Sequence, residues 1–499
     1  MLIGLLLTTA FVALGLWLIG RIGLFHMPGV PARWVMGVYL LKVLAGMALW
    51  GIYTFYYTDR TTADIYKYFD DALVMHSALP HHPADFVNML TGIGGDPDHL
   101  HRTYYDHMGH WYRPYGSSAT NDTHTIIRFN ALVRLFSMGH YPVHSAVMNL
   151  LSLLGLVCIA RFLAHTVADR AKWVFAVVML MPGVLFWGSG VLKEGMLFLG
   201  IGLLLRACAV FIYGDGSSRT AWLLLPAAAV LLTVKSYALI ILPALVAMIP
   251  FFRMGIWGMW GLYGLGALLL MIGPSVPGLP DVWQRLAIKQ AEFGKLAHGG
   301  TYLQRITPSL TDTVYVASAH HDSIVAGPGR FQVPASVPMF PLVRLTVDSS
   351  VTVPHLPSER FNLLLDYGRT GSRISIPHID GTVIGTLRAV PTALVNALLR
   401  PWPWQAGSPF LALALLENLL LLVLFLIPMF FPSRPFDARI VSLCLIFGLG
   451  ILILTGLVTP VVGAIVRYKV PALPFLAAMC IHLTDTQRLE ASLRSLFRK

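Results

Sequence analysis

The chain has 499 residues, of which 56% are hydrophobic and only 12% are charged, against about 25% charged residues in soluble domains. Its formal net charge of +12 does not indicate nucleic-acid binding, because the basic residues are mostly scattered singly at the ends of apolar segments. The composition excludes an ordinary soluble domain and predicts an integral membrane protein embedded in a lipid bilayer.

Apolar segments recur along the whole chain, and about eleven of them approach the roughly 20 residues that a helix needs to cross a bilayer. The first is expected to be a retained span, because Arg21 follows it and no basic residue precedes it, the reverse of a cleavable signal. The expected spans are residues 2–20, 35–57, 143–164, 173–188, 191–213, 221–234, 237–252, 256–272, 410–431, 440–457 and 461–483. The sixth and seventh are short and could form one broken helix. The predicted fold class is an α-helical polytopic membrane protein.

Basic residues in the short loops predict the orientation of these spans, since cytoplasmic loops are enriched in lysine and arginine. With the N-terminus outside, one face receives Arg21, Arg33, Arg170, Lys172, Arg219, Arg253, Arg434, Arg439, Arg488, Arg494, Arg498 and Lys499. We therefore expect a cytoplasmic C-terminus. The predicted organisation is two spans (1–57), a first outer loop (58–142), six spans (143–273), a second outer loop or small domain (274–409), and three spans with a basic tail (410–499).

The first outer loop opens with TDRTTADIYKYFDD, residues 58–71, which places four carboxylates close to the membrane surface. A positioned carboxylate can accept the proton of an acceptor hydroxyl, and Asp64 lies near the membrane, where a lipid-linked head group would sit. The alternative is structural: residues 61–64 match the S/T-x-x-D/E capping pattern, so Asp64 could satisfy the start of a juxtamembrane helix. Asp70, Asp71 and the more distant Asp106 are second choices for a catalytic base.

The remainder of this loop contains two further patterns. Residues 123–139, THTIIRFNALVRLFSMG, intersperse apolar side chains with polar ones and predict an amphipathic helix in the membrane interface. Just before them, Asn121-Asp122-Thr123 fits a glycosylation sequon, a pattern too common to carry weight.

Histidines also gather in this loop, at positions 99, 101, 107 and 110, and aspartates lie near them. Mixed His and Asp ligands could bind a divalent cation, and the weak candidates are His99, His101, His107 and His110. Their spacing matches no fixed ligand pattern, so solvated loop histidines are the favoured interpretation and no cofactor is firmly expected.

The second outer loop begins with a helical pattern over residues 282–296 and continues with Pro- and Gly-rich, β-branched segments such as 314–317 and 343–353. It predicts a small mixed α/β or irregular outer domain. The chain returns through residues 387–399 to Trp402 and Trp404, which are expected to be interface anchors.

Several cations are expected at the outer face, against the positive-inside trend. They are Lys193, Lys235, Arg400, Arg467 and Lys469. Such a group could bind a lipid phosphate or diphosphate, with arginine supplying bidentate contacts. The alternative is local: Lys193 pairs with Glu194 or another loop acid, and Arg467 snorkels to head groups. Lys42 and Glu417 are also expected inside or at the edge of spans, and Glu417-Asn418 could be a partner for one of these cations.

Three stretches together resemble the GT-C superfamily of integral-membrane glycosyltransferases. They are Ala63-Asp64-Ile65-Tyr66-Lys67-Tyr68-Phe69 after an early span, the turn from Pro182 to Glu194, and Ile465-Val466-Arg467-Tyr468-Lys469-Val470-Pro471 at the last helix. The resemblance implies polyprenyl-phosphate-linked sugar donors, a bacterial cytoplasmic membrane and a role in cell-envelope polysaccharide synthesis. It implies Asp64 as catalytic base and Lys193, Arg467 and Lys469 as lipid-phosphate ligands, with Tyr68, Glu194 and Tyr468 in support. The chain departs from the usual pattern because two spans, not one, precede the acidic loop, and because the long outer domain lies between spans.

The leading hypothesis is therefore transfer of a sugar from a polyprenyl phosphate carrier to a lipid, glycan or protein acceptor at the outer face. Asp64 would deprotonate the acceptor hydroxyl, and the cations would stabilise the departing phosphate. A second hypothesis is a polymerase or ligase of lipid-linked polysaccharide, which would depend on the basic residues and tolerate loss of Asp64. A third is a transporter or flippase, which predicts internal symmetry and charges at the membrane midplane.

Overall fold

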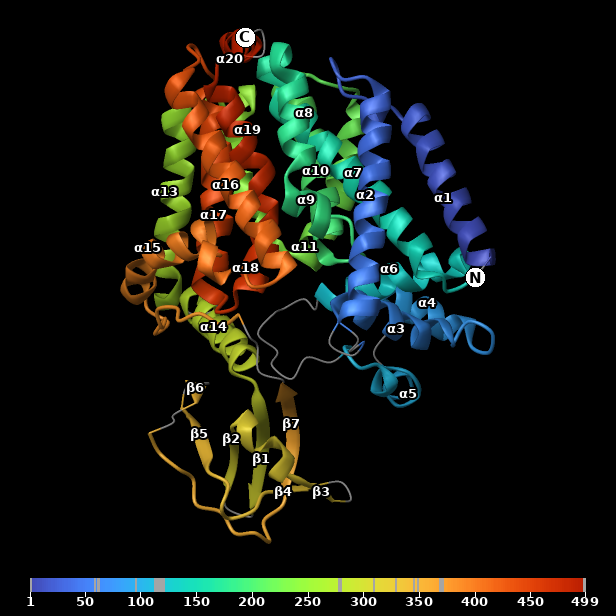
Figure 1. Cartoon of the computed structure of the whole chain (residues 1–499), viewed down its shortest axis with the longest axis vertical. Helices are drawn as coiled ribbons and strands as arrows, with labels where there is room; N and C mark the ends of the chain where they lie inside the picture. Colours follow the sequence, from blue (N-terminus) through green and yellow to red (C-terminus); the bar gives the residue numbers. More distant parts are fainter. Residues whose placement is uncertain are drawn as a thin grey trace.

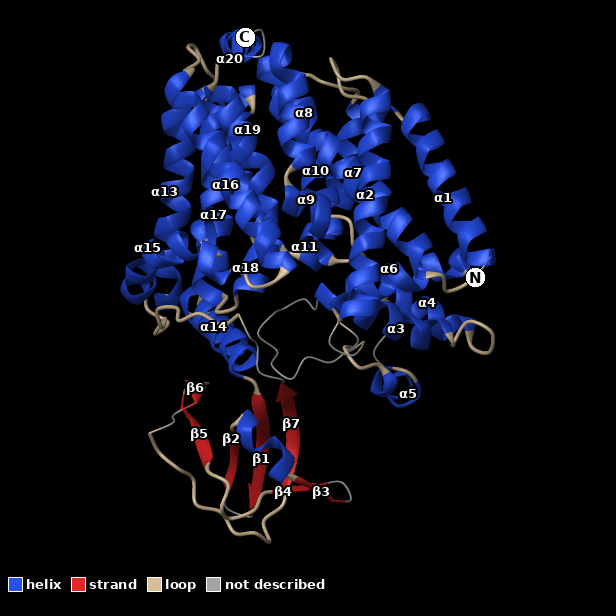
Figure 2. Ribbon diagram, in the orientation of Figure 1, coloured by secondary structure: helices blue, strands red, loops and turns tan. Residues whose placement is uncertain are grey.

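The protein is a helical bundle with a small β domain attached at one end (Figures 1 and 2). The computed structural model describes residues 2–57, 60, 63–94, 97–111, 122–276, 281–307, 310–327, 330–343, 346–347, 350–367 and 372–496. We call the end that carries the β domain the domain end. The opposite end, which carries the C-terminal helix α20 (Thr486–Leu496), is the tail end.

Among the described residues, eight helical segments are long and apolar enough to cross a membrane. They are α1 (Leu2–Arg21), α2 (Ala32–Gly51) with the π-helical turn η2 (Ile52–Tyr56), α7 (Tyr141–Ala164) with α8 (Ala171–Leu180), α10 (Lys193–Tyr213), α13 (Ile256–Ile272), α16 (Pro409–Phe430), α17 (Ala438–Val458), and α18 (Val462–Tyr468) with α19 (Leu473–Leu483). Shorter apolar helices are α11 (Leu224–Val234), α12 (Leu242–Met248) and α15 (Val383–Leu399). A multi-pass membrane protein is thus confirmed, and the count of eleven spans stays a prediction. The two termini lie at opposite ends of the bundle, which fits an odd number of crossings (Figure 1).

One predicted span is interrupted, and the break expected between the sixth and seventh spans is present. The expected span 173–188 ends as α8 at Leu180, and Met181 is extended (φ −57°, ψ 129°) before α9 (Pro182–Trp187) begins. Proline causes this break, because it has no amide hydrogen to donate and disfavours helical geometry in the residue before it. Lys235 is likewise extended (φ −153°, ψ 87°) and separates α11 from the short turn that precedes α12. At both breaks the backbone leaves the helical conformation, so the side chains and backbone polar groups there no longer follow the regular arrangement of a helix.

The turn between α9 and α10 is held by a buried lysine from α2. Lys42 is fully buried and its Nζ donates to the Gly188 carbonyl at 2.8 Å and to Ser189 Oγ at 3.2 Å. The Gly188 carbonyl also accepts from Ser152 Oγ at 2.9 Å. Irregular backbone inside a membrane must have its polar groups satisfied within the protein. Lys42 therefore stabilises the non-helical turn that leads directly into Lys193 and Glu194.

The first long connection folds into α3 (Asp64–His76), α4 (Pro83–Thr91), α5 (Asp98–Thr103) and α6 (Asp122–Ser137) against the domain end (Figure 1). The helix predicted over residues 123–139 is confirmed as α6. It buries Ile126, Ile127 and Phe129 while exposing Leu132 and Phe136. The exposed apolar side chains suit a position at the membrane interface.

The second long connection starts with α14 (Val282–His298), which forms the stem of the β domain. The domain is a seven-stranded antiparallel sheet in the order β3-β4-β7-β1-β2-β5-β6. Its strands are β1 (Gly300–Thr307), β2 (Leu310–Val316), β3 (Val325–Gly327), β4 (Arg330–Gln332), β5 (Met339–Val343), β6 (Thr346–Val347) and β7 (Phe361–Tyr367). Val314 and Val316 alternate along β2 and point into one small core with Leu303 and Met339.

The stem is fixed to the bundle by one buried glutamine. Gln290 Nε2 donates to the carbonyls of Pro377 (2.9 Å) and Leu457 (2.6 Å), and Gln290 Oε1 accepts from the Ile379 amide at 2.9 Å. The bond to Leu457 ties α14 to the domain end of α17, and the other two tie it to the segment that precedes α15. The next-door residue, Lys289, is thereby brought to the candidate site described below.

Candidate functional site

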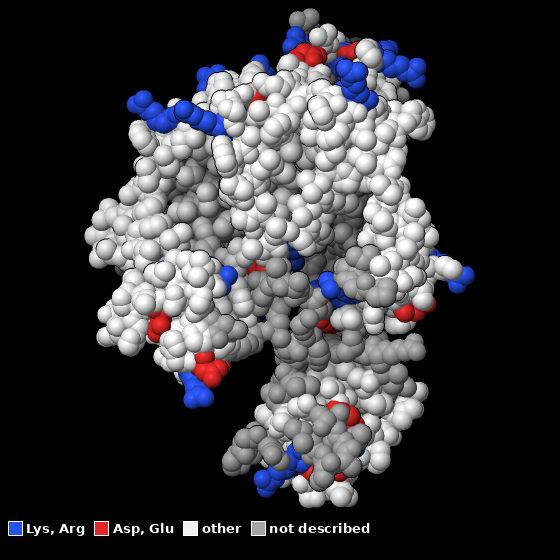
Figure 3. All heavy atoms as spheres, turned by 180° about the vertical axis from the view of Figure 1, so that it is seen from behind, with Lys and Arg blue, Asp and Glu red and all other residues white. Residues whose placement is uncertain are grey.

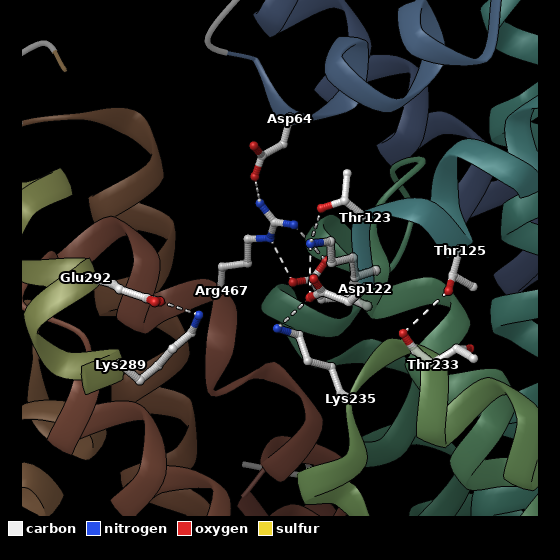
Figure 4. A network of polar contacts seen from close by, with 11 residues as sticks. Asp64, Asp122, Thr123, Thr125, Thr233, Lys235, Lys289, Glu292 and Arg467 are labelled. Carbon is white, nitrogen blue, oxygen red and sulfur yellow. Dashed lines mark hydrogen bonds and ion pairs between the residues drawn. The ribbon is translucent and has the colours of Figure 1, made fainter. Parts of the chain in front are cut away.

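Charged side chains from five separate segments meet at the domain end of the bundle (Figure 4). Arg467, at the end of α18, donates to Glu194 from Nε (2.7 Å) and Nη2 (3.1 Å), and its Nη1 donates to Asp64. Glu194 lies in the first turn of α10 and Asp64 begins α3. We call these three residues the Arg467 cluster. The flat guanidinium fork matches two carboxylates at once, which lysine cannot do.

A second group of charges adjoins the first. Asp122 Oδ2 lies 3.0 Å from both Lys193 Nζ and Lys235 Nζ. The three residues come from the start of α6, the start of α10 and the break after α11, and we call them the Asp122 cluster. Lys193 and Glu194 are consecutive in the chain, so the two clusters are joined through α10. In Figure 3, charged side chains of both signs lie in the hollow between the bundle and the β domain, whereas most of the flank of the bundle in this view carries no Lys, Arg, Asp or Glu.

Asp64 is the most exposed of the clustered carboxylates, with 34% of its side chain accessible. Burial alone would raise the pKa of Asp64, but Arg467, Lys67 and Lys193 together hold it below its usual value. Lys67 Nζ lies 3.2 Å from Asp64 Oδ1. Asp64 is therefore an accessible, ionised carboxylate at neutral pH.

The capping interpretation of Asp64 is wrong. A capping box would place Asp64 in the third position of the helix, but α3 begins at Asp64 itself, after Ala63, and no side chain caps it. Thr61, the expected cap, lies outside the described residues. The Asp64 carboxylate bonds instead to Arg467, which lies 403 positions away in the chain.

Two cavities flank the clusters. The lysine cavity, of about 270 Å³, is lined by Asp122, Lys235, Lys289 and Tyr468, and helix α17 supplies an apolar wall that includes Leu454 and Val458. The aromatic groove, of about 690 Å³, is lined by Tyr53, Tyr57, Trp187, Arg373, Gln405 and Phe410, among others. Arg467 links them, because its guanidinium carbon lies 6.0 Å from the Trp187 ring and its neighbour Tyr468 faces the lysine cavity.

Two predicted phosphate ligands lie elsewhere. Lys469 is only 1% exposed and donates to Asn418, with Glu417 Oε1 at 3.9 Å. Glu417 also accepts from the Gly183 amide. The predicted partnership of Glu417-Asn418 with one of the cations is thus present, but it removes Lys469 from the site. Arg400 Nε donates to Asn396 at 2.9 Å, one helical turn away in its own segment.

The predicted supporting residues adjoin the clusters. Glu194 is a member of the Arg467 cluster, and Tyr468 lines the lysine cavity with the Lys235 amine 5.8 Å from its ring. Tyr68 lies beneath Lys193, whose amine is 5.3 Å from the ring centre. Lys193 therefore pairs with Asp122, an acid of the first outer loop, as the local alternative expected, and it also lies over Tyr68.

The second-choice carboxylates have other contacts. Asp70 forms an exposed ion pair with Arg60, at 2.7 and 2.6 Å. Asp71 is buried and accepts from the backbone amides of Gly109 and His110 at 2.9 and 2.8 Å, which anchors the loop to α3. Asp106 lies in the short helical turn η3 (Tyr105–His107).

The loop histidines occupy separate positions. His99 Nε2 lies 3.0 Å from Asp85 Oδ1, His101 packs edge-on against Tyr105, and His110 Nδ1 lies 3.7 Å from Asp71 Oδ2. His107 ends the turn η3. Within the described part of the chain, no three His, Cys, Asp or Glu side chains are grouped closely enough to share a metal ion.

Two site residues were missed by the sequence analysis. Asp122 was visible only as the centre of a glycosylation sequon, and Lys289 follows a helical pattern within a long polar loop. The start of α6 was a usable signal for Asp122, because acidic residues favour helix N-termini. No local pattern distinguishes Lys289, which pairs with Glu292 at 2.7 Å as ordinary helix-surface residues do.

The chain was compared with protein-family models, with curated proteins and with solved structures, and none of them matches it. Its function is therefore argued from the geometry of the two clusters and the two cavities.

Proposed function

We propose that this protein is a membrane glycosyltransferase that moves a sugar from a polyprenyl-phosphate donor to an acceptor hydroxyl. The observation that carries the proposal is the meeting of an accessible, ionised Asp64 with Arg467, Lys193 and Lys235 at one end of the bundle. General-base catalysis on a hydroxyl needs such a carboxylate, and a departing phosphate needs such cations.

The lysine cavity is the proposed site of the donor phosphate. Lys235 and Lys289 supply positive charge, and Leu454 and Val458 supply an apolar wall for the first units of a lipid chain. Burial alone would lower the pKa of Lys235, but Asp122 holds it above its ordinary value, so the amine stays charged. A phosphate that enters would replace part of the contact between Asp122 and its two lysines.

The proposed reaction is a direct displacement. The acceptor oxygen forms a bond to the anomeric carbon as the bond from that carbon to the phosphate oxygen breaks. The acceptor proton passes to Asp64, and the lipid phosphate leaves with the bonding electron pair. Attack from the face opposite the phosphate inverts the anomeric centre. The negative charge that grows on the leaving oxygen is stabilised by the lysines and by Arg467.

The proposed location is a bacterial cytoplasmic membrane, with the domain end outside. Lysine and arginine side chains gather at the tail end of the bundle in Figure 3, which is the arrangement of cytoplasmic loops. This orientation places α3, the clusters and the β domain on the extracytoplasmic side.

The substitution Asp64→Asn tests the proposal. It keeps the size of the side chain and removes the base, so transfer should fall by roughly 10²–10⁴-fold. Transfer is measured as loss of radiolabelled sugar from a polyprenyl phosphate donor in membranes, at matched expression. Asp70→Asn is the matched control, because Asp70 lies on the same helix with 43% of its side chain exposed. Transfer at the wild-type rate in Asp64→Asn would remove Asp64 from the mechanism.

One observation favours a second function, a ligase or polymerase of lipid-linked polysaccharide. The ion pair with Arg467 weakens Asp64 as a base, whereas Arg467, Lys193 and Lys235 carry the positive charge that a diphosphate leaving group requires. In that enzyme Asp64→Asn would retain activity and Arg467→Gln would abolish it. The two variants together separate the two functions.

A further inference from the structure

The aromatic groove has no role in the donor site proposed above, although it lies beside the same arginine. Its volume of about 690 Å³ is within the roughly 300–1,000 Å³ of small-molecule sites. The groove is formed by η2, α9, the start of α16 and the segments around Arg373 and Gln405. It therefore combines parts of the chain that are far apart in sequence, as the clusters do.

The groove is lined by aromatic rings that pack around Phe410, two of them stacked on it and one tilted. The Phe410 ring lies 5.7 Å from Tyr57 at an interplanar angle of 13°, 6.5 Å from Tyr53 at 25°, and 6.0 Å from Trp187 at 33°. Tyr57 is 39% exposed, so the surface is accessible from outside. The C–H faces of sugar rings pack well on flat aromatic surfaces, because both are apolar and the ring faces carry partial negative charge.

The rim of the groove is polar, which separates it from a lipid site. Arg373, Gln405 and Ser408 line it together with the rings. A hydrocarbon chain would displace water from these groups and form no hydrogen bonds with them, which is unfavourable. The hydroxyls of a sugar ring point outward from its edge and can bond to such a rim. The lysine cavity differs from the groove, because helix α17 supplies one apolar wall that includes Leu454 and Val458.

The groove reaches the candidate base. Its Trp187 ring lies 6.0 Å from the guanidinium carbon of Arg467, and its Tyr53 side chain is close enough to interact electrostatically with Asp64 and Glu194. The wall of the groove that contains Trp187 and Tyr53 thus lies beside the Arg467 cluster, to which Asp64 belongs.

We propose that the aromatic groove binds the acceptor and that the acceptor is a carbohydrate chain. Its terminal sugar packs on the rings, and one of its hydroxyls faces Asp64. This inference rests on the proposed glycosyl transfer, which left lipid, glycan and protein acceptors open. Donor and acceptor then approach Arg467 from different sides, the donor through the lysine cavity and the acceptor through the groove.

Photocrosslinking in the full-length protein tests the groove. Benzoylphenylalanine is placed at Tyr57, and cells that express the variant are irradiated before the protein is purified and its adducts are weighed by mass spectrometry. The matched control position is Tyr56, which is 66% exposed and does not line the groove. We expect adducts that carry sugar residues at Tyr57 and phospholipid adducts at Tyr56. A Gln405→Leu background should reduce the sugar-bearing adduct about tenfold.

Tyr57 adducts that contain only acyl or prenyl chains, or no adduct at Tyr57, would overturn the carbohydrate assignment. Adding Asp64→Asn to the Tyr57 variant separates this inference from the proposed function. If Asp64 is the base, unreacted acceptor accumulates and the sugar-bearing adduct increases. If Asp64→Asn leaves transfer intact, the role of Asp64 fails, while the Tyr57 adduct still reports what occupies the groove.

Discussion

Arg467 and Lys469 are two residues apart, yet Arg467 belongs to a partly exposed group of charges and Lys469 to a buried one. Arg467 meets Asp64 and Glu194 where a third of the Asp64 side chain is accessible, whereas Lys469 and Glu417 are each 1% exposed. Residues two apart on a helix point about 200° apart, so one turn of chain supplies cations to opposite sides. Partial exposure allows the first centre to exchange a protein partner for a substrate. The second centre is enclosed and joins α16 to α9 and to the end of α18.

The largest expected effect concerns the enclosed pair. Lys469→Met leaves the Glu417 carboxylate buried without its cation, and breaking a buried pair in this way costs about 3–5 kcal/mol. We expect a large loss of thermal stability in detergent, with unchanged transfer per folded molecule. The double variant Lys469→Met with Glu417→Gln should recover much of the stability. A folded but inactive Lys469→Met protein would show that the two centres are not separate.

An effect of intermediate size is expected in the lysine cavity. Lys235→Met and Lys289→Met each remove one charge from the donor site and should raise the KM for the donor about tenfold, which corresponds to about 1.4 kcal/mol. The KM for the acceptor should stay unchanged. Lys172→Met, an exposed lysine at the start of α8, is the matched control. Equal changes in the KM for the donor and the KM for the acceptor would show that the lysines support the structure of the protein and do not bind the donor.

A smaller effect is expected in the pH dependence. The pKa of Asp64 is held below its usual value, of about 4, by Arg467 and Lys67 despite its burial. The stabilisation from this pairing is present above the usual pKa and is lost as the pH falls below it. Wild-type transfer should therefore show no loss from Asp64 protonation between pH 7 and about 5. Lys67→Met should move the acid limb of the pH profile of transfer to higher pH, whereas Lys67→Arg should not. Identical pH profiles for Lys67→Met and the wild type would contradict this account.

The smallest effect is expected for the exposed pair on α3. Arg60 and Asp70 are 51% and 43% exposed, and exposed pairs contribute about 0–1 kcal/mol. Asp70→Asn should change stability by less than 1 kcal/mol and transfer by less than twofold. A large loss of transfer would make Asp70, not Asp64, the first candidate for the base.

Features that depend on local sequence were well predicted. The apolar runs, the helix α6, the helical stem α14 and the cations around the last span all follow from composition and periodicity within short windows. The interruption at Met181 was not predicted, although Pro182, which follows it, was a usable signal.

Features that depend on distant contacts were not predicted. The ion pair between Asp64 and Arg467 could not be read from the sequence around Asp64, because Arg467 lies 403 positions away. Lys469 looked like a phosphate ligand because the direction of its side chain is set by α16, which supplies Glu417 and Asn418. Lys289 reaches the site because Gln290 fixes α14 against α17, a contact that spans 167 positions. The local sequence shows which side chains are charged, and only the fold shows which of them are in contact.

The buried Lys42 has a consequence for how the chain is made. It lies near the middle of α2, where a lysine raises the free energy of membrane insertion by about 2.5–3.5 kcal/mol. Its hydrogen-bond acceptors, Gly188 and Ser189, are 146 and 147 positions further along the chain. During synthesis α2 must therefore enter the bilayer before the groups that satisfy its amine exist. The Lys42 amine gains its hydrogen bonds only when the α9–α10 turn packs against α2. Assembly of the bundle therefore depends on the order of translation.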